Sequence, residues 1–117
     1  MFDRGELIIN FSYYYKPSIE CGVKHATSRL KRYPVEVGDI VRCRYVEHDC
    51  PYFYIKITGI KKIKFRKLSN DDALYEGYLD KVLLKQVLKS HYPKIKGDDV
   101  IYQYIFEYRG VWNLWLK

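Results

Sequence analysis

Apolar and polar side chains alternate with a spacing of two in several segments of the chain, among them residues 40–46, 61–67 and 100–108, which is typical of half-buried β-strands. The segment Glu6–Phe11 is instead a short apolar run that suits a buried strand. In the longest alternating segment, Gly59 predicts a bulge or bend of the kind that curves a small sheet into a barrel. We therefore predict strands at residues 6–11, 27–29, 40–46, 52–65 and 100–108.

Helix signals occur in three other places. Pro17 suits the first turn of a brief helix, which Gly22 would end. In the segment 69–76 a capping serine is followed three residues later by an acid, which predicts a short helix. Leucines and valines at helical spacing predict a longer helix over residues 80–91.

This order of elements predicts the α+β class, with a small, β-barrel-like, partly open sheet and two or three short helices over its mouth. A chain of 117 residues has room for one hydrophobic core, so we predict a single domain over residues 1–117. Residues 109–117 follow the last strand as an apolar C-terminal extension. Its Trp112 and Trp115 need burial, either on the domain or on a partner.

The charge of the chain narrows the choice of partners. Its 21 Lys and Arg residues against 14 Asp and Glu residues give a net charge of +7, which favours anionic partners such as nucleotides or RNA. The alternation within residues 61–67 places Lys62, Lys64 and Arg66 on one face of a strand. Two interpretations stay open: a solvated edge that the cations keep soluble, or a stripe that contacts phosphates.

The chain shows no targeting or membrane-spanning pattern. No window approaches the ~20 apolar residues that a helix needs to cross a bilayer. The first ten residues lack the pattern of a secretory signal. The three cysteines form an odd set without a framework spacing, as expected of reduced thiols. We expect a cytoplasmic protein with no membrane partner, and the oligomeric state stays open.

A metal site could be considered at Cys43, His48 and Cys50. These residues include no C-x-x-C pair and extend over a strand and a loop, whereas structural zinc sites need four closely spaced ligands. Glycine-rich phosphate loops and the G-x-S-x-G motif are absent from the sequence as well. We therefore predict no metal and no cofactor.

The stretch Gly22–Arg29 reads G-x-K-x-x-T-x-R and is the best candidate for chemistry. A lysine that loses its proton in a desolvated site can activate a nearby hydroxyl, so Lys24 and Thr27 could form a nucleophilic pair. The alternative is a solvated cation beside a strand-forming threonine. In a straight strand Lys24 would point away from Thr27, so the reactive interpretation requires the chain to turn near Gly22.

Several motifs along the chain together resemble the ASCH domains, relatives of the PUA fold that is associated with RNA. They are the G-x-K-x-x-T-x-R stretch, V-x-V-G-D at residues 35–39, a Leu-Ser helix start at residue 68 that runs to a glutamate, the L-x-x-V-L and Y-P pair within residues 84–93, and the last strand at residues 100–106. The likeness extends from about Ile19 to Tyr108. It is greatest to the YqfB-type enzymes, which are N4-acetylcytidine amidohydrolases.

This resemblance implies a metal-independent amidohydrolase whose substrate is a small nucleoside or modified base. Its catalytic residues would be Thr27 as nucleophile, Lys24 as its base and Glu76 as the group that holds the lysine or handles the leaving amine's proton. Arg29 would bind the substrate or stabilise developing charge. Tyr52 and Tyr54 are candidates for stacking on a pyrimidine, although packing in the core is the favoured role for them.

The chain also departs from the family pattern. It has His25 where the family usually has threonine and Ser28 where it has an apolar residue, and the segment from Arg29 to Gly38 differs in length. The main alternative is an RNA-binding ASCH module, with or without weak ribonuclease activity, that contacts phosphates through Lys24, Arg29 and the stripe at Lys62, Lys64 and Arg66. Another is an interaction protein whose tryptophan-bearing tail docks on a partner.

Overall fold

A computed structural model describes residues 7–111 of the chain. Its strands are β1 (Ile8–Ser12), β2 (Ala26–Arg29), β3 (Ile40–Val46), β4 (Phe53–Lys64) and β5 (Val100–Val111). Its helices are α1 (Lys16–Glu20), α2 (Asn70–Tyr75) and α3 (Lys81–His91), with 3₁₀ turns η1 (Tyr13–Tyr15) and η2 (Phe65–Lys67). Within residues 7–111, no helix is long and apolar enough to span a membrane.

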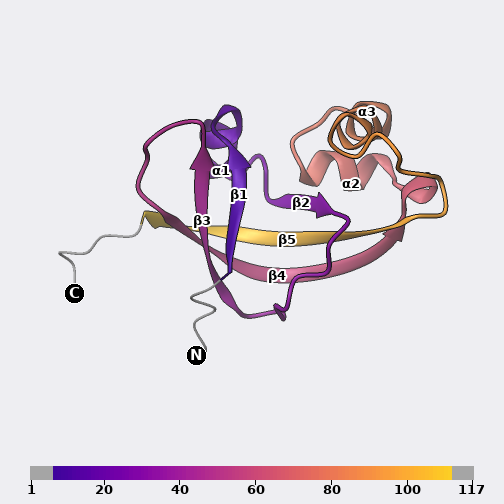
Figure 1. Ribbon diagram of the computed structural model, residues 1–117. Helices are drawn as coiled ribbons and strands as arrows, with labels where there is room; N and C mark the ends of the chain where they lie inside the picture. The colour runs from indigo at the N-terminus through magenta and orange to yellow at the C-terminus, as the bar shows by residue number, and fades with distance from the viewer. Residues whose placement is uncertain (1–6, 112–117) are drawn as a thin grey trace.

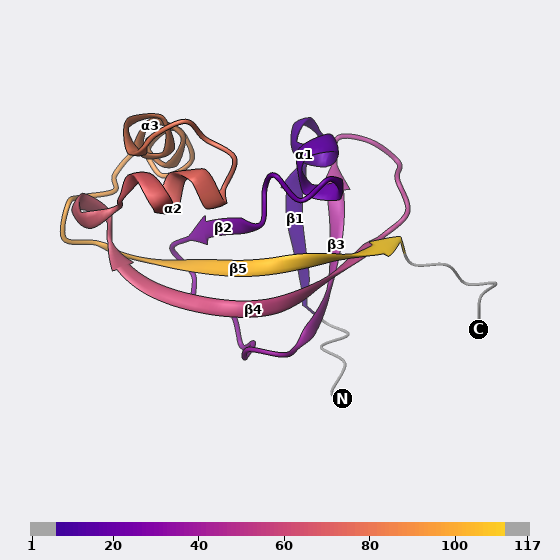
Figure 2. The same ribbon diagram turned by 180° about the vertical axis from the view of Figure 1, so that it is seen from behind.

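The strands form one mixed sheet in the order β1-β3-β4-β5-β2. Strands β1 and β3 run parallel, and every other neighbouring pair runs antiparallel. The two edge strands, β1 and β2, do not pair with each other, so the sheet curls without closing (Figures 1 and 2). This arrangement confirms the predicted α+β class and the partly open barrel.

Strands β4 and β5, each of 12 residues, form the longest antiparallel pair of the sheet. Its register shifts between Ile57 and Gly59, which confirms the bulge predicted at this glycine. A Cβ atom on Gly59 would lie 3.2 Å from Ile105 Cδ1, so the two strands approach closely there. Strand β5 continues to Val111, beyond the predicted end at Tyr108. The tryptophans of the predicted extension, Trp112 and Trp115, lie outside the described residues.

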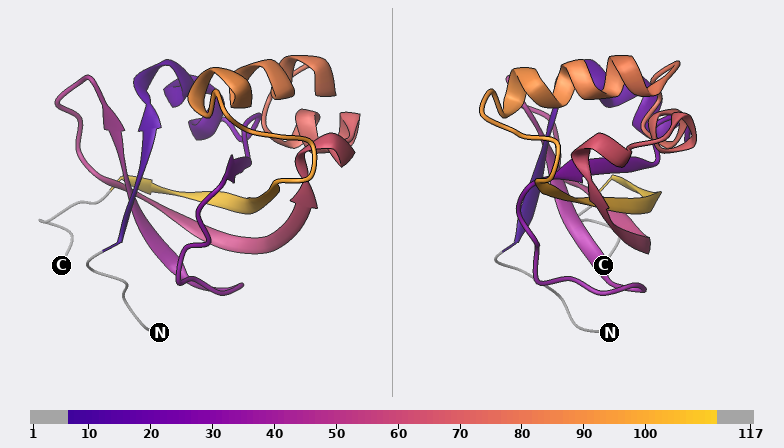
Figure 3. Two further views of the ribbon diagram at one scale, coloured as in Figure 1. Left: turned by 45° about the vertical axis from the view of Figure 1, so that its right-hand side comes forward. Right: turned by 90° about the vertical axis from the view of Figure 1, so that its right-hand side faces the viewer.

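All three helices lie on one side of the β4–β5 pair, α1 toward one end and α2 with α3 toward the other (Figures 1 and 3). The helices therefore cover two separate hydrophobic clusters. The larger cluster gathers buried side chains of β1, β3, β4 and β5 around Ile19 of α1. The smaller one packs Leu84 and Leu88 of α3 against Ala73 of α2 and Ile101 of β5.

Helix α2 has a well-defined start and end. Ser69 and Asp72 form a capping box in which each side chain accepts a hydrogen bond from the other residue's backbone N–H. The helix stops at Gly77, whose φ of +88° is a conformation that glycine adopts without strain. The capping box and Gly77 together fix the position of Glu76, which lies between the last residue of α2 and this glycine.

The predicted basic stripe is only partly a strand face. Lys62 and Lys64 lie exposed in β4, but the strand ends at Lys64, and Arg66 belongs to the 3₁₀ turn that follows. The Arg66 Nε donates to Asp98 Oδ1 at 2.8 Å. Residue 66 therefore does not continue the alternation, and its charge is paired.

Loss of the capping box should destabilise the fold measurably. We expect Ser69→Ala to lower the free energy of unfolding by about 1 kcal/mol, because the Asp72 N–H then lacks its acceptor. Denaturant unfolding followed by circular dichroism measures the change. Ser90→Ala is the matched control, since the exposed Ser90 hydroxyl donates only to the Val87 carbonyl within α3. Equal stability of the two variants would contradict the capping role.

Candidate active site

A cavity of about 510 Å³ lies where the two edge strands of the sheet fail to pair. Its walls come from residues 10–12 of β1, residues 27–29 of β2, the end of α2 and one face of α3. Four predicted site residues line it together: Lys24, Thr27, Arg29 and Glu76. The fold thus collects groups from separate parts of the chain into one pocket.

The backbone turns before β2, as the reactive interpretation of Lys24 requires. Gly22 has a φ of +87°, and β2 begins only at Ala26, so Lys24 is not part of a strand. The Lys24 N–H donates to the Ser18 carbonyl of α1 at 2.9 Å, which fixes the turn. Its side chain can therefore enter the pocket beside Thr27.

The Lys24 side chain is only 4% exposed. Its Nζ lies 3.8 Å from Glu76 Oε1 and donates to the Glu76 carbonyl at 3.4 Å. It also lies 4.7 Å from the centre of the Tyr15 ring and 5.4 Å from that of Tyr78, within range of cation–π attraction. The hydroxyls of the two tyrosines hydrogen-bond to each other, so the rings form a joined wall beside the amine.

Burial lowers the pKa of Lys24 from 10.5 to about 8, because desolvation penalises the charged ammonium. The carboxylate of Glu76 opposes this change, and the positive charge of Arg29 adds to it. At neutral to mildly alkaline pH the amine therefore exists in both protonation states. A group with a pKa near the working pH is suited to transfer protons in both directions.

Glu76 is held by neutral donors as well as by the lysine. Its Oε2 accepts hydrogen bonds from the Ser28 hydroxyl and from Gln103 Nε2, the latter at 2.9 Å. Ser28 and Gln103 face each other across β2 and β5, so the sheet register places both donors on one oxygen. The other oxygen, Oε1, lies toward Lys24.

Sequence reasoning did not assign Ser28 and Gln103 to the site. Ser28 was visible as a departure from the ASCH pattern, and Gln103 as a polar residue within a largely apolar strand. Gln103 is fully buried and Ser28 is 6% exposed. Buried polar side chains of this kind need a partner, which is the signal that could have identified both.

Arg29 holds Thr27 and bridges the open side of the sheet. Its Nε donates to Thr27 Oγ1 at 3.0 Å, its Nη1 to the Tyr33 hydroxyl at 3.2 Å and its Nη2 to the Asn10 carbonyl of β1 at 2.8 Å. A cation that donates to a hydroxyl oxygen favours the deprotonated form of that hydroxyl. Within residues 7–111, no hydrogen bond joins Lys24 Nζ to Thr27 Oγ1.

The predicted stacking residues Tyr52 and Tyr54 do not line this pocket. Tyr54 pairs with Arg42 and Gly110 inside the sheet, and the Arg42 guanidinium lies 5.6 Å from the Tyr52 ring centre. The aromatic walls are formed instead by other residues: Phe11, Tyr15, Tyr78 and Tyr92. The cations Lys62, Lys64 and Arg66 do not line the pocket either.

The thiol and imidazole groups considered for a metal lie apart from the pocket. Cys43 is buried in the larger core cluster, where burial raises the pKa of its thiol. The His48 ring packs on Tyr13 with ring centres 3.9 Å apart. Among the residues that the structure describes, no three His, Cys, Asp or Glu side chains gather as a metal site would require.

Comparison with known proteins supports the fold of the chain. No protein-family model matches the sequence, and no curated protein matches it either. The structure is similar to that of an ASCH domain from Lactobacillus crispatus, with 18% identity, coverage of 88% of this chain and 80% of that one, and a TM-score of 0.70. The chain has the fold of an ASCH domain.

Two further solved structures share this ASCH fold. A protein of the DUF984 family from Enterococcus faecalis is 16% identical, with coverage of 95% of this chain and 78% of that one and a TM-score of 0.69. The ASCH protein from Zymomonas mobilis is 14% identical, with coverage of 92% and 72% and a TM-score of 0.63. Such similarity supports the PUA-like architecture predicted from the sequence, while the chemistry has to be argued from the pocket.

The titration of Lys24 can be measured without any substrate. We expect the Cε chemical shift of labelled Lys24 to titrate with a midpoint near pH 8, well below the ordinary value of 10.5. Glu76→Gln should move the Lys24 midpoint to lower pH, because the carboxylate that favours the ammonium is removed. A midpoint above 10 in the unmodified protein would contradict the buried position of the amine.

Proposed function

We propose that this chain is an amidohydrolase that removes the acyl group from an N-acylated nucleoside or base, with N4-acetylcytidine as the first substrate to test. The observation that supports this function best is the buried Lys24 amine, which shares one pocket with a hydroxyl, a carboxylate and a guanidinium. A lysine with a pKa of about 8 can act as a base near neutral pH, which an ordinary exposed lysine cannot.

The first half of the proposed reaction transfers the acyl group to the enzyme. Neutral Lys24 takes the proton of the Thr27 hydroxyl, and Oγ1 attacks the carbonyl carbon of the amide. Arg29 stabilises the developing negative charge from its position 3.0 Å from Oγ1. The carbon–nitrogen bond then breaks, and the exocyclic amine of the base leaves with the proton that Lys24 held.

The second half releases the acid. Lys24, neutral again, takes a proton from water, and the hydroxide attacks the acyl ester on Thr27. The ester bond breaks, Thr27 recovers its proton from Lys24, and acetic acid leaves and gives its proton to the solvent to become acetate. Glu76 stabilises the ammonium in both halves through Oε1, while Ser28 and Gln103 keep its carboxylate in place.

The alternative function, an RNA-binding module without hydrolysis, contacts phosphates through Lys24, Arg29 and the stripe at Lys62, Lys64 and Arg66. Burial argues against that use of Lys24, because a lysine that is 4% exposed cannot reach the backbone of a large nucleic acid from inside the pocket. Arg29 is likewise engaged with Thr27, Tyr33 and Asn10. The pocket therefore favours an enzyme that acts on a small group inserted into it.

Acetate release from N4-acetylcytidine tests this proposal directly. We expect Lys24→Met and Thr27→Ala each to lower kcat/KM by about 100-fold or more, because one removes the base and the other the nucleophile. Lys67→Met is the matched control, since it replaces an exposed lysine in the turn after β4. Thr27→Ser should keep more activity than Thr27→Ala, because the hydroxyl is retained.

Two outcomes would count against the proposal in different ways. If the unmodified protein releases no acetate, N4-acetylcytidine is not its substrate. If Lys24→Met turns over as fast as Lys67→Met, hydrolysis occurs without the assigned base. Thermal unfolding of each variant shows whether lost activity reflects lost structure.

The proposed base also sets the pH dependence of the reaction. Below its pKa the lysine is charged and cannot accept a proton, so kcat/KM should rise with pH and level off above about pH 8. In Glu76→Gln the midpoint of this rise should move to lower pH even as the maximum rate falls. Initial rates between pH 6 and 10 measure both effects, and a pH-independent rate in this range would exclude Lys24 as the base.

A further inference from the structure

A second cavity, of about 520 Å³, adjoins the candidate active site. Residues His91 and Tyr92 at the end of α3 line both cavities, so they form a shared wall. The second cavity continues over apolar side chains and is more open to solvent than the first. We call it the α3-end groove; its other lining residues are Leu30, Pro93, Lys94, Ile95 and Asp99.

The two chain segments that supply most of the groove carry positive charge and no Asp or Glu. Residues 29–33, around Leu30, include three Lys or Arg, and so do residues 89–96 around Tyr92. The one acid that lines the groove, Asp99, accepts a hydrogen bond from the Lys96 N–H at 2.8 Å. The surroundings of the groove therefore suit an anionic ligand.

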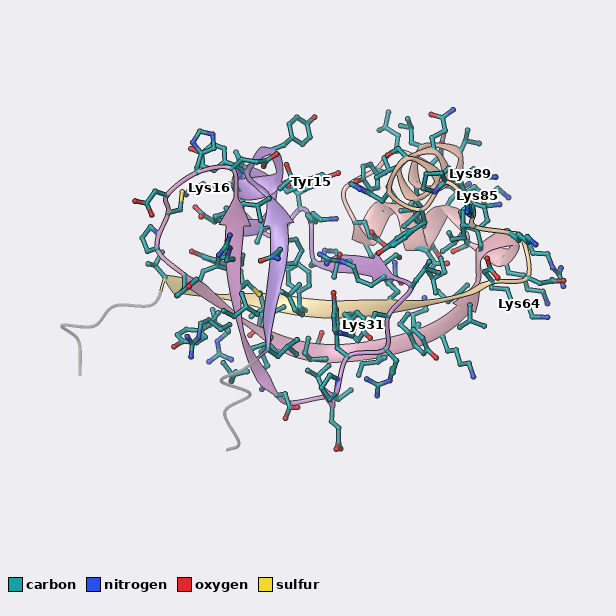
Figure 4. The ribbon with its side chains drawn as sticks, viewed as in Figure 1. Tyr15, Lys16, Lys31, Lys64, Lys85 and Lys89 are labelled. Carbon is teal, nitrogen blue, oxygen red and sulfur yellow. The ribbon has the colours of Figure 1, made fainter. Side chains whose placement is uncertain are left out.

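Several of these cations are not engaged with the protein. Within residues 7–111, no ion pair or hydrogen bond holds the side-chain amines of Lys31, Lys89, Lys94 or Lys96. All four lysines are exposed. Figure 4 shows Lys31 on the segment that follows β2 and Lys89 on α3. The groove itself is lined by Leu30 and by residues 91–95 and 99, so of the four lysines only Lys94 lines it. These amines are available to a ligand, unlike the paired Arg66 of the predicted stripe.

We propose that the α3-end groove binds the nucleotide next to the acylated one, so that the preferred substrate is an oligonucleotide that carries the acylated base. This inference rests on the proposed function, because it assumes that the acylated base occupies the first cavity. The neighbouring base lies on the apolar surface of Leu30, Tyr92 and Pro93. Lys94 contacts the phosphate that joins the two nucleotides.

The first experiment compares substrates of increasing size. We expect kcat/KM to rise by about tenfold from N4-acetylcytidine to a dinucleotide that carries the acetylated base at its 5′ or its 3′ position, because a second base stacks in the groove. The 5′- and 3′-monophosphates of N4-acetylcytidine show how much of the gain in kcat/KM comes from the phosphate alone. If a monophosphate gives the whole gain, or if no dinucleotide exceeds the nucleoside, the proposal is wrong.

Two lysine variants test whether the higher kcat/KM for the dinucleotide depends on the α3-end groove. Lys94→Gln should lower kcat/KM for the favoured dinucleotide by about fivefold and leave that for N4-acetylcytidine unchanged, because its amine lies outside the first cavity. Lys67→Gln, which changes an exposed lysine that lines neither cavity, should alter neither value. Equal effects of both variants on the dinucleotide would overturn the assignment.

A binding measurement separates this inference from the proposed chemistry. The unmodified dinucleotide cytidylyl-cytidine should shift the backbone amide signals of Leu30, Lys94 and Ile95 in NMR spectra, and cytidine should not. If these shifts occur but no acetylated substrate is hydrolysed, the proposed function fails and the groove remains a nucleotide site. If acetylated substrates are hydrolysed but the dinucleotide leaves these signals unchanged, the groove proposal fails alone.

Discussion

The structure of the site depends on the burial of one amine. Removing a charged lysine from water is costly, and the cost is reduced here by a single carboxylate and by two aromatic faces. Neither form of the amine is strongly preferred, because desolvation and the carboxylate act in opposite directions. The turn before β2 and the end of α2 both serve to hold Lys24 and Glu76 in this balance.

The carboxylate in turn connects elements that are far apart in the sequence. Glu76 follows α2, Ser28 lies in β2 and Gln103 in β5, and hydrogen bonds join all three. A buried polar cluster in which the carboxylate is satisfied contributes orientation more than stability, since replacing such groups by apolar ones often costs little. In this domain the cluster orients the carboxylate so that Oε1 of Glu76 lies toward Lys24.

Local signals in the sequence were sufficient for most of the fold. The capping serine, the bulge glycine and the alternation of residues 40–46 act over a few residues, and each predicted its element correctly. The pocket depends on contacts between distant segments, which a single sequence does not display. For that reason the sequence pointed to Tyr52 and Tyr54 and not to Tyr15 and Tyr78, which line the pocket, and the donors to Glu76 were not assigned.

Strands β1 and β2 do not pair, and this affects how the ligand preference of the domain can evolve. Strands β4 and β5 hold much of the larger core but do not line the first cavity, whose walls come from β1, β2, the ends of neighbouring elements and α3. Substitutions at lining residues that belong to neither hydrophobic cluster, such as Val87 and His91, therefore reshape the cavity and leave core packing intact. An open sheet of this kind can acquire new ligand preferences at low cost in stability, whereas a closed barrel would have to disturb its interior.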